Sequence, residues 1–154
     1  MSSTNLLSPL NFAFQLSRTP ELVYSAQRAS LPPITLTTSD IVTPFISIPL
    51  PGKIEYGEFS VTFLVDELLT NYLEIVNWMN AIGHPETLEN YENISSDASV
   101  LIMNSAKRPV IKVNFTDVVP TSISQIDLDT TLTDVPYVPA TVSFKYLRYN
   151  FEIL

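Results

Sequence analysis

The chain has 154 residues, no cysteine and a net charge of −8, and only 16% of its residues are charged. This length suits one domain with a core large enough to fold without staples, and the lack of cysteine excludes disulfides and thiolate metal sites. Ordinary soluble domains contain about 25% charged residues. A chain with so few charges and 45% hydrophobic residues is expected to hide part of its surface in partners.

The acidic residues are concentrated in the middle of the chain, where residues 54–106 contain no Lys or Arg. Nucleic-acid binding needs basic side chains to replace phosphate counterions, so this surface is expected to repel nucleic acid. The first residues lack the basic stretch and apolar core of a signal peptide. No apolar run reaches the roughly 18 residues of a membrane span, so no membrane anchor is expected.

In chain order, the first predicted elements are extended. "NFAFQLS" (residues 11–17) alternates in hydropathy as a half-buried strand does, and "ELVYSAQRAS" (residues 21–30) is expected to continue as a second, less regular strand. Residues 41–57 then contain three prolines, at positions 44, 49 and 51. Each proline lacks the N–H that a central strand uses, so this stretch is predicted to be a long, exposed, extended hairpin or loop.

The clearest strand is followed directly by the main helix. In residues 58–65 Phe59, Val61 and Phe63 share one face, whereas from Leu68 to Ile82 the apolar residues recur at helical spacing. Gly83 and the proline two residues later are typical of a helix end. The helix is expected to pack on the sheet through four side chains: Tyr72, Ile75, Val76 and Met79.

The second half of the chain is predicted to be extended throughout. "ASVLIMN" and "PVIKVNFTDV" are predicted strands joined by "SAKR", "TSISQIDLD" (residues 121–129) is another, and "ATVSFKYLRYNFEIL" closes the chain with alternating apolar positions. The fold class is therefore mainly β, a sandwich or barrel of antiparallel strands with one flanking helix. So many strands beside a single helix argue against parallel βαβ folds.

Reactive constellations are not evident in the sequence. Asp66 and Glu67 lie where strand turns into helix; adjacent residues point apart, so they are expected to favour the positive end of the helix dipole, with Asp66 as an N-cap. A single histidine, His84, cannot build a histidine-rich metal site. Nucleophile-elbow and phosphate-binding glycine motifs are missing. An enzyme is not expected, and no catalytic residue, cofactor or metal site is assigned.

The order of several stretches along the chain is informative. They are "NFAFQLS", the small-residue run "AQRASLP", "GEFSVTFLVDELLTNYLEIVNWM" with its late Trp, "ASVLIMN", "VNFTDVVPTSISQIDLD" and "ATVSFKYLRYNFEI". This order, from about Asn11 to Ile153, resembles the tail tube protein family of contractile-tailed bacteriophages, which is related to the tube proteins of type VI secretion. The chain departs from the family in its short, plain N-terminus and its proline-heavy residues 35–53. Those departures leave open a main tube subunit or a relative at a tube end.

The resemblance implies a single tail-tube-like domain over residues 1–154, with two packed antiparallel sheets and a flanking helix. It implies hexameric rings whose inner strands join edge to edge and which stack into the inner tube of a contractile tail. The implied partners are further copies, the tail sheath protein, and baseplate and tube-end proteins. DNA would pass through without specific binding. The implied location is the virion, after assembly in the host cytoplasm.

Two sets of residues are candidates for roles in such a tube. Residues 35–53 are expected to project as a proline-rich loop that contacts the neighbouring ring through Pro44, Phe45, Ile46, Ile48, Leu50 and Lys53. Asp127 and Asp129 are expected on the polar face of the strand at residues 121–129, where they would line an acidic bore. An ordinary solvated face is the alternative, and a weak divalent-ion site is conceivable although the glycine of a calcium loop is missing.

Other functions stay open from the residues alone. A baseplate tube-initiator, a tube-terminator or a type VI secretion tube subunit would share the same architecture. A monomeric ligand-binding β-barrel would belong to another class, and it would show an amphipathic lining without the long proline-rich excursion.

Overall fold

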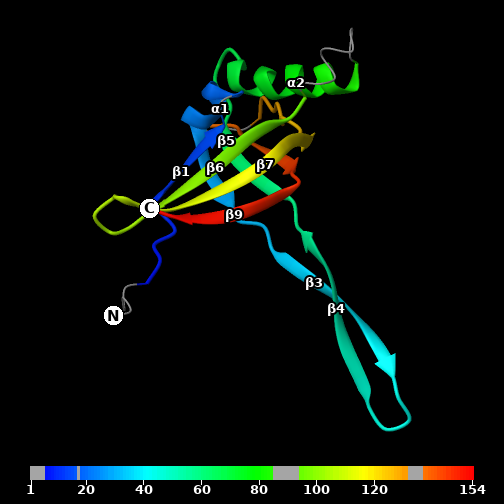
Figure 1. Ribbon diagram of the computed structural model, residues 1–154. Helices are drawn as coiled ribbons and strands as arrows, with labels where there is room; N and C mark the ends of the chain where they lie inside the picture. Colours follow the sequence, from blue (N-terminus) through cyan, green and yellow to red (C-terminus); the bar gives the residue numbers. More distant parts are fainter. Residues whose placement is uncertain (1–5, 17, 85–93, 132–136) are drawn as a thin grey trace.

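The computed structural model describes residues 6–16, 18–84, 94–131 and 137–154. It shows a β body from which a two-stranded hairpin projects, with one long helix across the opposite end of the body (Figure 1). The elements in chain order are β1 (Phe12–Leu16), α1 (Pro20–Ser25), β2 (Ala26–Ser30), β3 (Ile34–Val42), β4 (Ser47–Tyr56), β5 (Phe59–Leu64), α2 (Thr70–Gly83), β6 (Ser96–Met103), β7 (Pro109–Ile123), β8 (Pro139–Lys145) and β9 (Arg148–Ile153).

The body is a seven-stranded antiparallel sheet that folds over on itself. Its strand order is β1-β6-β7-β8-β5-β2, and β9 pairs with β7 beside this path. The first half of β7 lies between β6 and β9, whereas its last residues pair with β8. Strand β7 therefore belongs to both layers. The antiparallel β class with a flanking helix, predicted from the sequence, is confirmed.

Strand β7 changes layers at a bulge around Asp117. Ser96 pairs with Val118 and Ala98 pairs with Phe115, so one residue of β6 faces two residues of β7. Asp117 has a φ of 56°, in the left-handed region where aspartate is tolerated better than most residues. A bulge bends a strand and increases its twist. The predicted strand "PVIKVNFTDV" and the first three residues of the stretch predicted at residues 121–129 thus belong to one bent strand.

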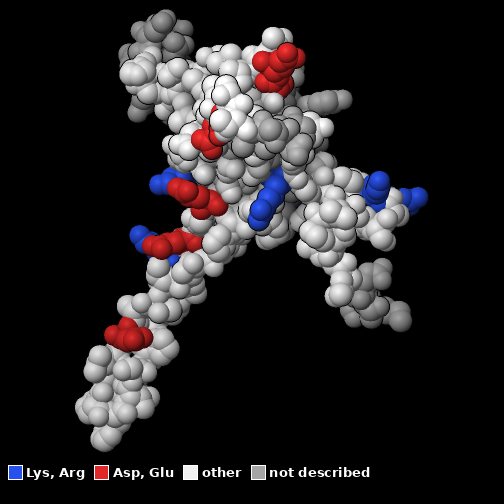
Figure 2. All heavy atoms as spheres, turned by 180° about the vertical axis from the view of Figure 1, so that it is seen from behind, with Lys and Arg blue, Asp and Glu red and all other residues white. Residues whose placement is uncertain are grey.

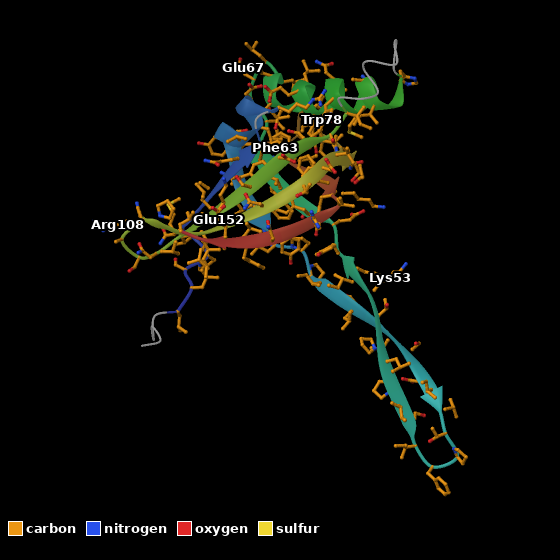
Figure 3. All side chains as sticks on the ribbon, in the orientation of Figure 1. Lys53, Phe63, Glu67, Trp78, Arg108 and Glu152 are labelled. Carbon is orange, nitrogen blue, oxygen red and sulfur yellow. The ribbon has the colours of Figure 1, made fainter. Side chains whose placement is uncertain are left out.

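The core lies between the two layers and is rich in aromatic rings. Phe59 stacks on Phe115 with ring centroids 4.4 Å apart, and Phe14 and Phe144 lie 5.7 Å and 6.1 Å from Phe59. The alternation predicted in β5 is confirmed, because Phe59, Val61 and Phe63 are fully buried. Figure 3 shows Phe63 inside the body.

Helix α2 is attached to the body by Ile75 and Trp78. Ile75 is fully buried, and the indole Nε1 of Trp78 donates a hydrogen bond to the Ile94 carbonyl at 2.6 Å. Of the predicted face, Tyr72 and Met79 are partly buried against the core and Val76 is half-buried. The buried stripe is therefore centred on Ile75 and Trp78.

A buried amide at Asn71 joins α2 to the rest of the fold. Its Nδ2 donates to the Leu64 carbonyl at 2.6 Å and to Ser25 Oγ at 2.8 Å. Its Oδ1 accepts from the backbone N–H groups of Tyr72 at 2.9 Å and Asp66 at 3.3 Å. Every donor and acceptor of this amide is used, so its burial carries no unpaired polar group.

The junction before α2 is polar, but its geometry differs from the prediction. The helix begins at Thr70 rather than Leu68, and Leu69 at the N-cap has a φ of 58°. The carboxylate of Asp66 accepts a hydrogen bond from the Thr70 N–H at 2.6 Å, so it satisfies one of the open helix donors. Glu67 is exposed.

Two sequence predictions about secondary structure were wrong. Residues 20–25 form α1 instead of a strand, because proline suits the first turn of a helix and α2 packs against this segment. Strand β7 ends at Ile123, so residues 124–129 are not a strand. Leu128 is 88% exposed, and no apolar face exists there to pair with a polar one.

Substitution of Ile75 by Ala is expected to lower the free energy of unfolding by about 2–5 kcal/mol, because it leaves a cavity under α2. Leu73→Ala on the same helix is the matched control, since Leu73 is 45% exposed. Urea unfolding followed by circular dichroism gives both values. A loss of only a few tenths of a kcal/mol for Ile75→Ala would mean that α2 is not anchored through this residue.

Candidate assembly surfaces

The hairpin formed by β3 and β4 exposes apolar side chains that no other described part of the body covers. Phe45 at its turn is 94% exposed. The other large exposed hydrophobic residues of the hairpin are Ile34, Leu36, Ile41, Val42, Ile46, Ile48, Leu50 and Ile54. A two-stranded ribbon is at best marginally stable alone in water. An apolar ribbon of this kind is expected to be covered by another chain.

The hairpin carries its prolines where an edge strand tolerates them. Pro49 pairs with Asp40 and Pro51 pairs with Thr38 across the ribbon, and both strands of a two-stranded ribbon are edge strands, where proline is tolerated. No charged residue lies between Asp40 and Lys53. Figure 2 shows the outer part of the hairpin almost entirely free of charged side chains.

A second group of contacts fixes the middle of the ribbon. Thr37 Oγ1 accepts from the Lys53 N–H at 2.9 Å and donates to the Lys53 carbonyl at 3.0 Å. A Cβ on Gly52 would come within 2.6 Å of that same Oγ1 and 2.9 Å of the Thr37 carbonyl. Glycine is therefore needed at position 52 for the two strands to approach each other.

The base of the hairpin is held by two tyrosine hydroxyl groups. Tyr149 donates to the Pro32 carbonyl and Tyr146 donates to the Gly57 carbonyl, each at 2.8 Å. The Gly57 N–H in turn donates to the Pro33 carbonyl at 2.9 Å. These five residues, which we call the tyrosine clamp, lie where the chain leaves the body for the hairpin and where it returns.

Burial raises the pKa of both clamp phenols. For Tyr146 the neighbouring Tyr149 and Tyr56 rings add to the effect, and for Tyr149 the Tyr56 ring does. The three rings are in contact, with Tyr56 centroids 5.9 Å from Tyr146 and 5.4 Å from Tyr149. Both hydroxyl groups therefore keep their protons, and act as donors, throughout the neutral pH range.

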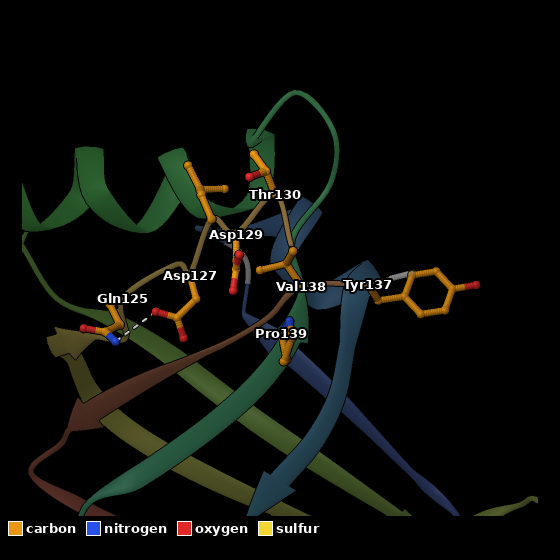
Figure 4. Close-up of a pocket in the computed structure, with 8 residues that line it drawn as sticks. Gln125, Asp127, Asp129, Thr130, Tyr137, Val138 and Pro139 are labelled. Atoms are coloured by element: carbon orange, nitrogen blue, oxygen red, sulfur yellow. Dashed lines mark hydrogen bonds between the residues drawn. The ribbon is translucent and has the colours of Figure 1, made fainter. Parts of the chain in front are cut away.

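Asp127 and Asp129 line an open hollow of about 590 Å³ at the end of the body near α2 (Figure 4). Gln125 donates to Asp127 at 3.0 Å, and Thr131 donates to Asp129 through its hydroxyl at 2.6 Å and its N–H at 2.9 Å. The Thr131 hydroxyl and then its N–H lower the pKa of Asp129. The structure brings the two predicted carboxylates together on a loop rather than on a strand face. Tyr137 also lines this hollow, and its side chain is 64% exposed.

Three strands of the described body have an unpaired edge. Strands β1 and β2 end the main path, and β9 pairs only with β7. Strand β9 also exposes Phe151 and Ile153. An open edge is a template for pairing with another chain, and natural proteins cover or blunt it.

Within residues 6–16, 18–84, 94–131 and 137–154, no cluster of His, Asp and Glu is suited to hold a metal ion. Across the same ranges, no helix is both long and apolar enough to cross a membrane. His84 is exposed at the end of α2, where its N–H donates to the Asn80 carbonyl at 2.7 Å.

Open strand edges and an uncovered apolar hairpin are surfaces that another chain is expected to cover. Residues 9–152 match the phage tail tube protein family, and the chain belongs to this family. It is a structural protein and not an enzyme. No curated protein matches the chain in sequence.

Solved structures share the fold at low sequence identity. A chain of the anti-feeding prophage tube-terminating cap has a TM-score of 0.76 and 15% identity, with 100% of this chain and 95% of that chain covered. A chain of the sheath-tube complex of an extracellular contractile injection system (PVC) in its extended state has a TM-score of 0.70 and 15% identity, with both chains fully covered at 100%. A type six secretion system protein has a TM-score of 0.53 and 14% identity, with 94% and 83% covered.

Proposed function

We propose that this protein is the subunit of an inner tube in a contractile tail or a tail-like injection particle. It assembles into hexameric rings, and the rings stack. The observation that carries the proposal is the hairpin, whose apolar residues are exposed on both strands although the rest of the fold buries a complete core. An exposed apolar surface of this extent is typical of a contact with another chain.

The position of the hairpin supports stacking in one direction. It leaves the body at the end opposite to α2 (Figure 1), so a neighbour lying beyond its tip is a copy in the next ring. A contact between different surfaces of identical chains repeats without closing when it involves translation, which produces a filament. The unpaired edges of β1, β2 and β9 are available for contacts within a ring. Residues 35–53 would then supply the contact between rings, through Pro44, Phe45, Ile46, Ile48, Leu50 and Lys53.

Further partners follow from the position of such a tube. A sheath protein would surround it, and baseplate and tube-end proteins would begin and close it. The similarity to a chain in a tube-terminating cap structure makes a tube-end protein the second candidate. The two candidates differ in their products, because a main tube subunit forms long tubes whereas a tube-end protein forms single rings.

Light scattering coupled to size-exclusion chromatography tests the proposal. A main tube subunit is expected to elute as species of six chain masses and larger, with the large species growing as the concentration rises. A tube-end protein would stop at the ring. A monomer at every concentration would contradict both assignments and favour a monomeric binding barrel.

DNA passage is part of the proposal, and Asp127 and Asp129 remain its candidates for the lining of an acidic bore. Replacing both with Lys is expected to leave assembly intact and to make tubes retain DNA at low salt, with release as the salt concentration rises. Glu58→Lys with Glu67→Lys is the matched control, because it makes the same charge change at exposed positions outside the hollow. DNA binding is measured by co-sedimentation.

Only retention by the tubes carrying Lys at 127 and 129, without retention by the control tubes, assigns these residues to the bore. If those tubes ignore DNA at every ionic strength, the two aspartates do not line it. Equal retention by both sets would reflect net charge alone and would also remove the assignment.

A further inference from the structure

We infer that the tyrosine clamp sets the direction in which the hairpin projects from the body. The clamp contacts both places where the hairpin joins the body. Tyr149 holds the outgoing chain at Pro32 and Tyr146 holds the returning chain at Gly57. Tyr146 lies in the short corner between β8 and β9, and Tyr149 is the second residue of β9, so one part of the body fixes both sides of the ribbon.

The hairpin has few other contacts with the described body. Nearly every residue of β3 and β4 is exposed. Tyr56 at the end of β4 supplies a packing contact, since it is partly buried and its ring contacts those of Tyr146 and Tyr149. The bonds at Pro32 and Gly57 are therefore among the few restraints between hairpin and body. Their partners are backbone carbonyls, so the restraint acts on the course of the chain rather than on a side chain that rotates freely.

The backbone at the base is stiff enough to transmit this restraint. Pro32 and Pro33 have fixed φ angles, and Pro32 is buried. A Cβ on Gly57 would lie 2.6 Å from Pro33 Cδ and 2.8 Å from Pro33 Cγ. The segments at Pro33 and Gly57 are therefore packed too closely for a Cβ at position 57, and glycine is required there. A ribbon held in this way pivots only if the hydroxyl bonds break.

The clamp matters for assembly if the proposed function holds, because ring stacking needs every hairpin to point the same way. An ordered ribbon direction lowers the entropy lost when the hairpin docks. The direction itself is a property of the single chain and is measured without assembly. Failure of the clamp and failure of the tube assignment are therefore separate results.

The test measures the distance between the hairpin and the body by double electron–electron resonance. The chain has no cysteine, so Ser47→Cys on the hairpin and Ala106→Cys in the β6–β7 turn take one spin label each. Both positions are exposed. The labelled protein is held below its assembly concentration, so that only distances within an unassembled chain are observed.

The key variant carries Tyr146→Phe and Tyr149→Phe, which keep the rings and remove the two hydroxyl groups. Tyr72→Phe is the matched control, because it also removes a bond from a tyrosine hydroxyl to a backbone carbonyl, that of Ser124 at 3.2 Å, away from the hairpin. Gly57→Ala opens the same base by steric pressure on Pro33. A hydrogen bond of ordinary strength changes a population about five-fold. Each lost clamp bond is therefore expected to enrich other hairpin directions by about that factor.

The expected result is a narrow distance distribution in the unmodified chain and in Tyr72→Phe, and a broad or shifted one in the double Phe variant and in Gly57→Ala. A double Phe distribution that coincides with that of the unmodified chain overturns the inference. If the double variant does not fold, the two single Phe variants are judged by the same criterion. The thermal unfolding of the double variant is expected to stay close to that of Tyr72→Phe, which separates positioning from general stability.

Discussion

Removal of residues 38–51 is expected to abolish tube formation while leaving the body folded. The cut follows the register, since Thr38 pairs with Pro51, and an Asn-Gly turn closes the remaining strands. The contacts of Thr37 with Lys53 and the tyrosine clamp remain. The apolar residues of the outer hairpin are exposed in the single chain, so the body loses little by their removal and the stack loses its contact. Electron microscopy and thermal unfolding give the two readouts.

A second variant separates the shape of the hairpin from its apolar surface. Phe45→Ser, Ile46→Thr, Ile48→Thr and Leu50→Thr keep a β-compatible ribbon of nearly full length. This variant is also expected to prevent stacking, because its apolar contact surface is gone. Tubes that still form from the shortened chain would remove the hairpin from the contact between rings.

Phe59→Ala is expected to cost about 3–5 kcal/mol of unfolding free energy. Phe59 is fully buried and its ring contacts Phe14, Phe115 and Phe144, so truncation leaves a large cavity between the two layers. Urea unfolding of the hairpin-shortened chain gives the value, since assembly would otherwise add to the apparent stability.

Phe45→Ala is the control for this measurement, made in the full-length chain held below its assembly concentration. It removes the same atoms from a side chain that is 94% exposed, and its effect is expected to stay within about 0.5 kcal/mol. A loss of less than about 1 kcal/mol for Phe59→Ala would contradict the position of the core.

Much of the fold could be predicted because the spacing of apolar residues along the chain indicates which face of a strand or helix is buried. Strict alternation in β5 gave its buried face, and the change to helical spacing gave α2 to within two residues of its start. The segment of α1 could not be predicted in the same way, since six residues are too few to show a helical period. The bend at Asp117 depends on which strands β7 pairs with, and pairing is not visible in the local pattern.

Among the candidate surfaces, the hairpin could be predicted from the local sequence, whereas the tyrosine clamp could not. Three prolines among exposed apolar residues indicated an extended segment outside the sheet, and the structure has a hairpin there. The tyrosine clamp was missed because Tyr146 and Tyr149 matched ordinary strand positions, while their hydroxyl partners lie 89 and 117 residues away in the chain. The strand expected at residues 121–129 was wrong beyond Ile123, where the chain leaves the sheet. Alternation in a short polar stretch occurs without strand pairing.

The most direct test of the tube assignment is negative-stain electron microscopy of the purified full-length chain over a range of concentrations. The account predicts rings with sixfold symmetry and a central channel, which stack into hollow tubes that lengthen as the concentration rises. Particles that remain single chains at every concentration, with no ring in any image class, would contradict it.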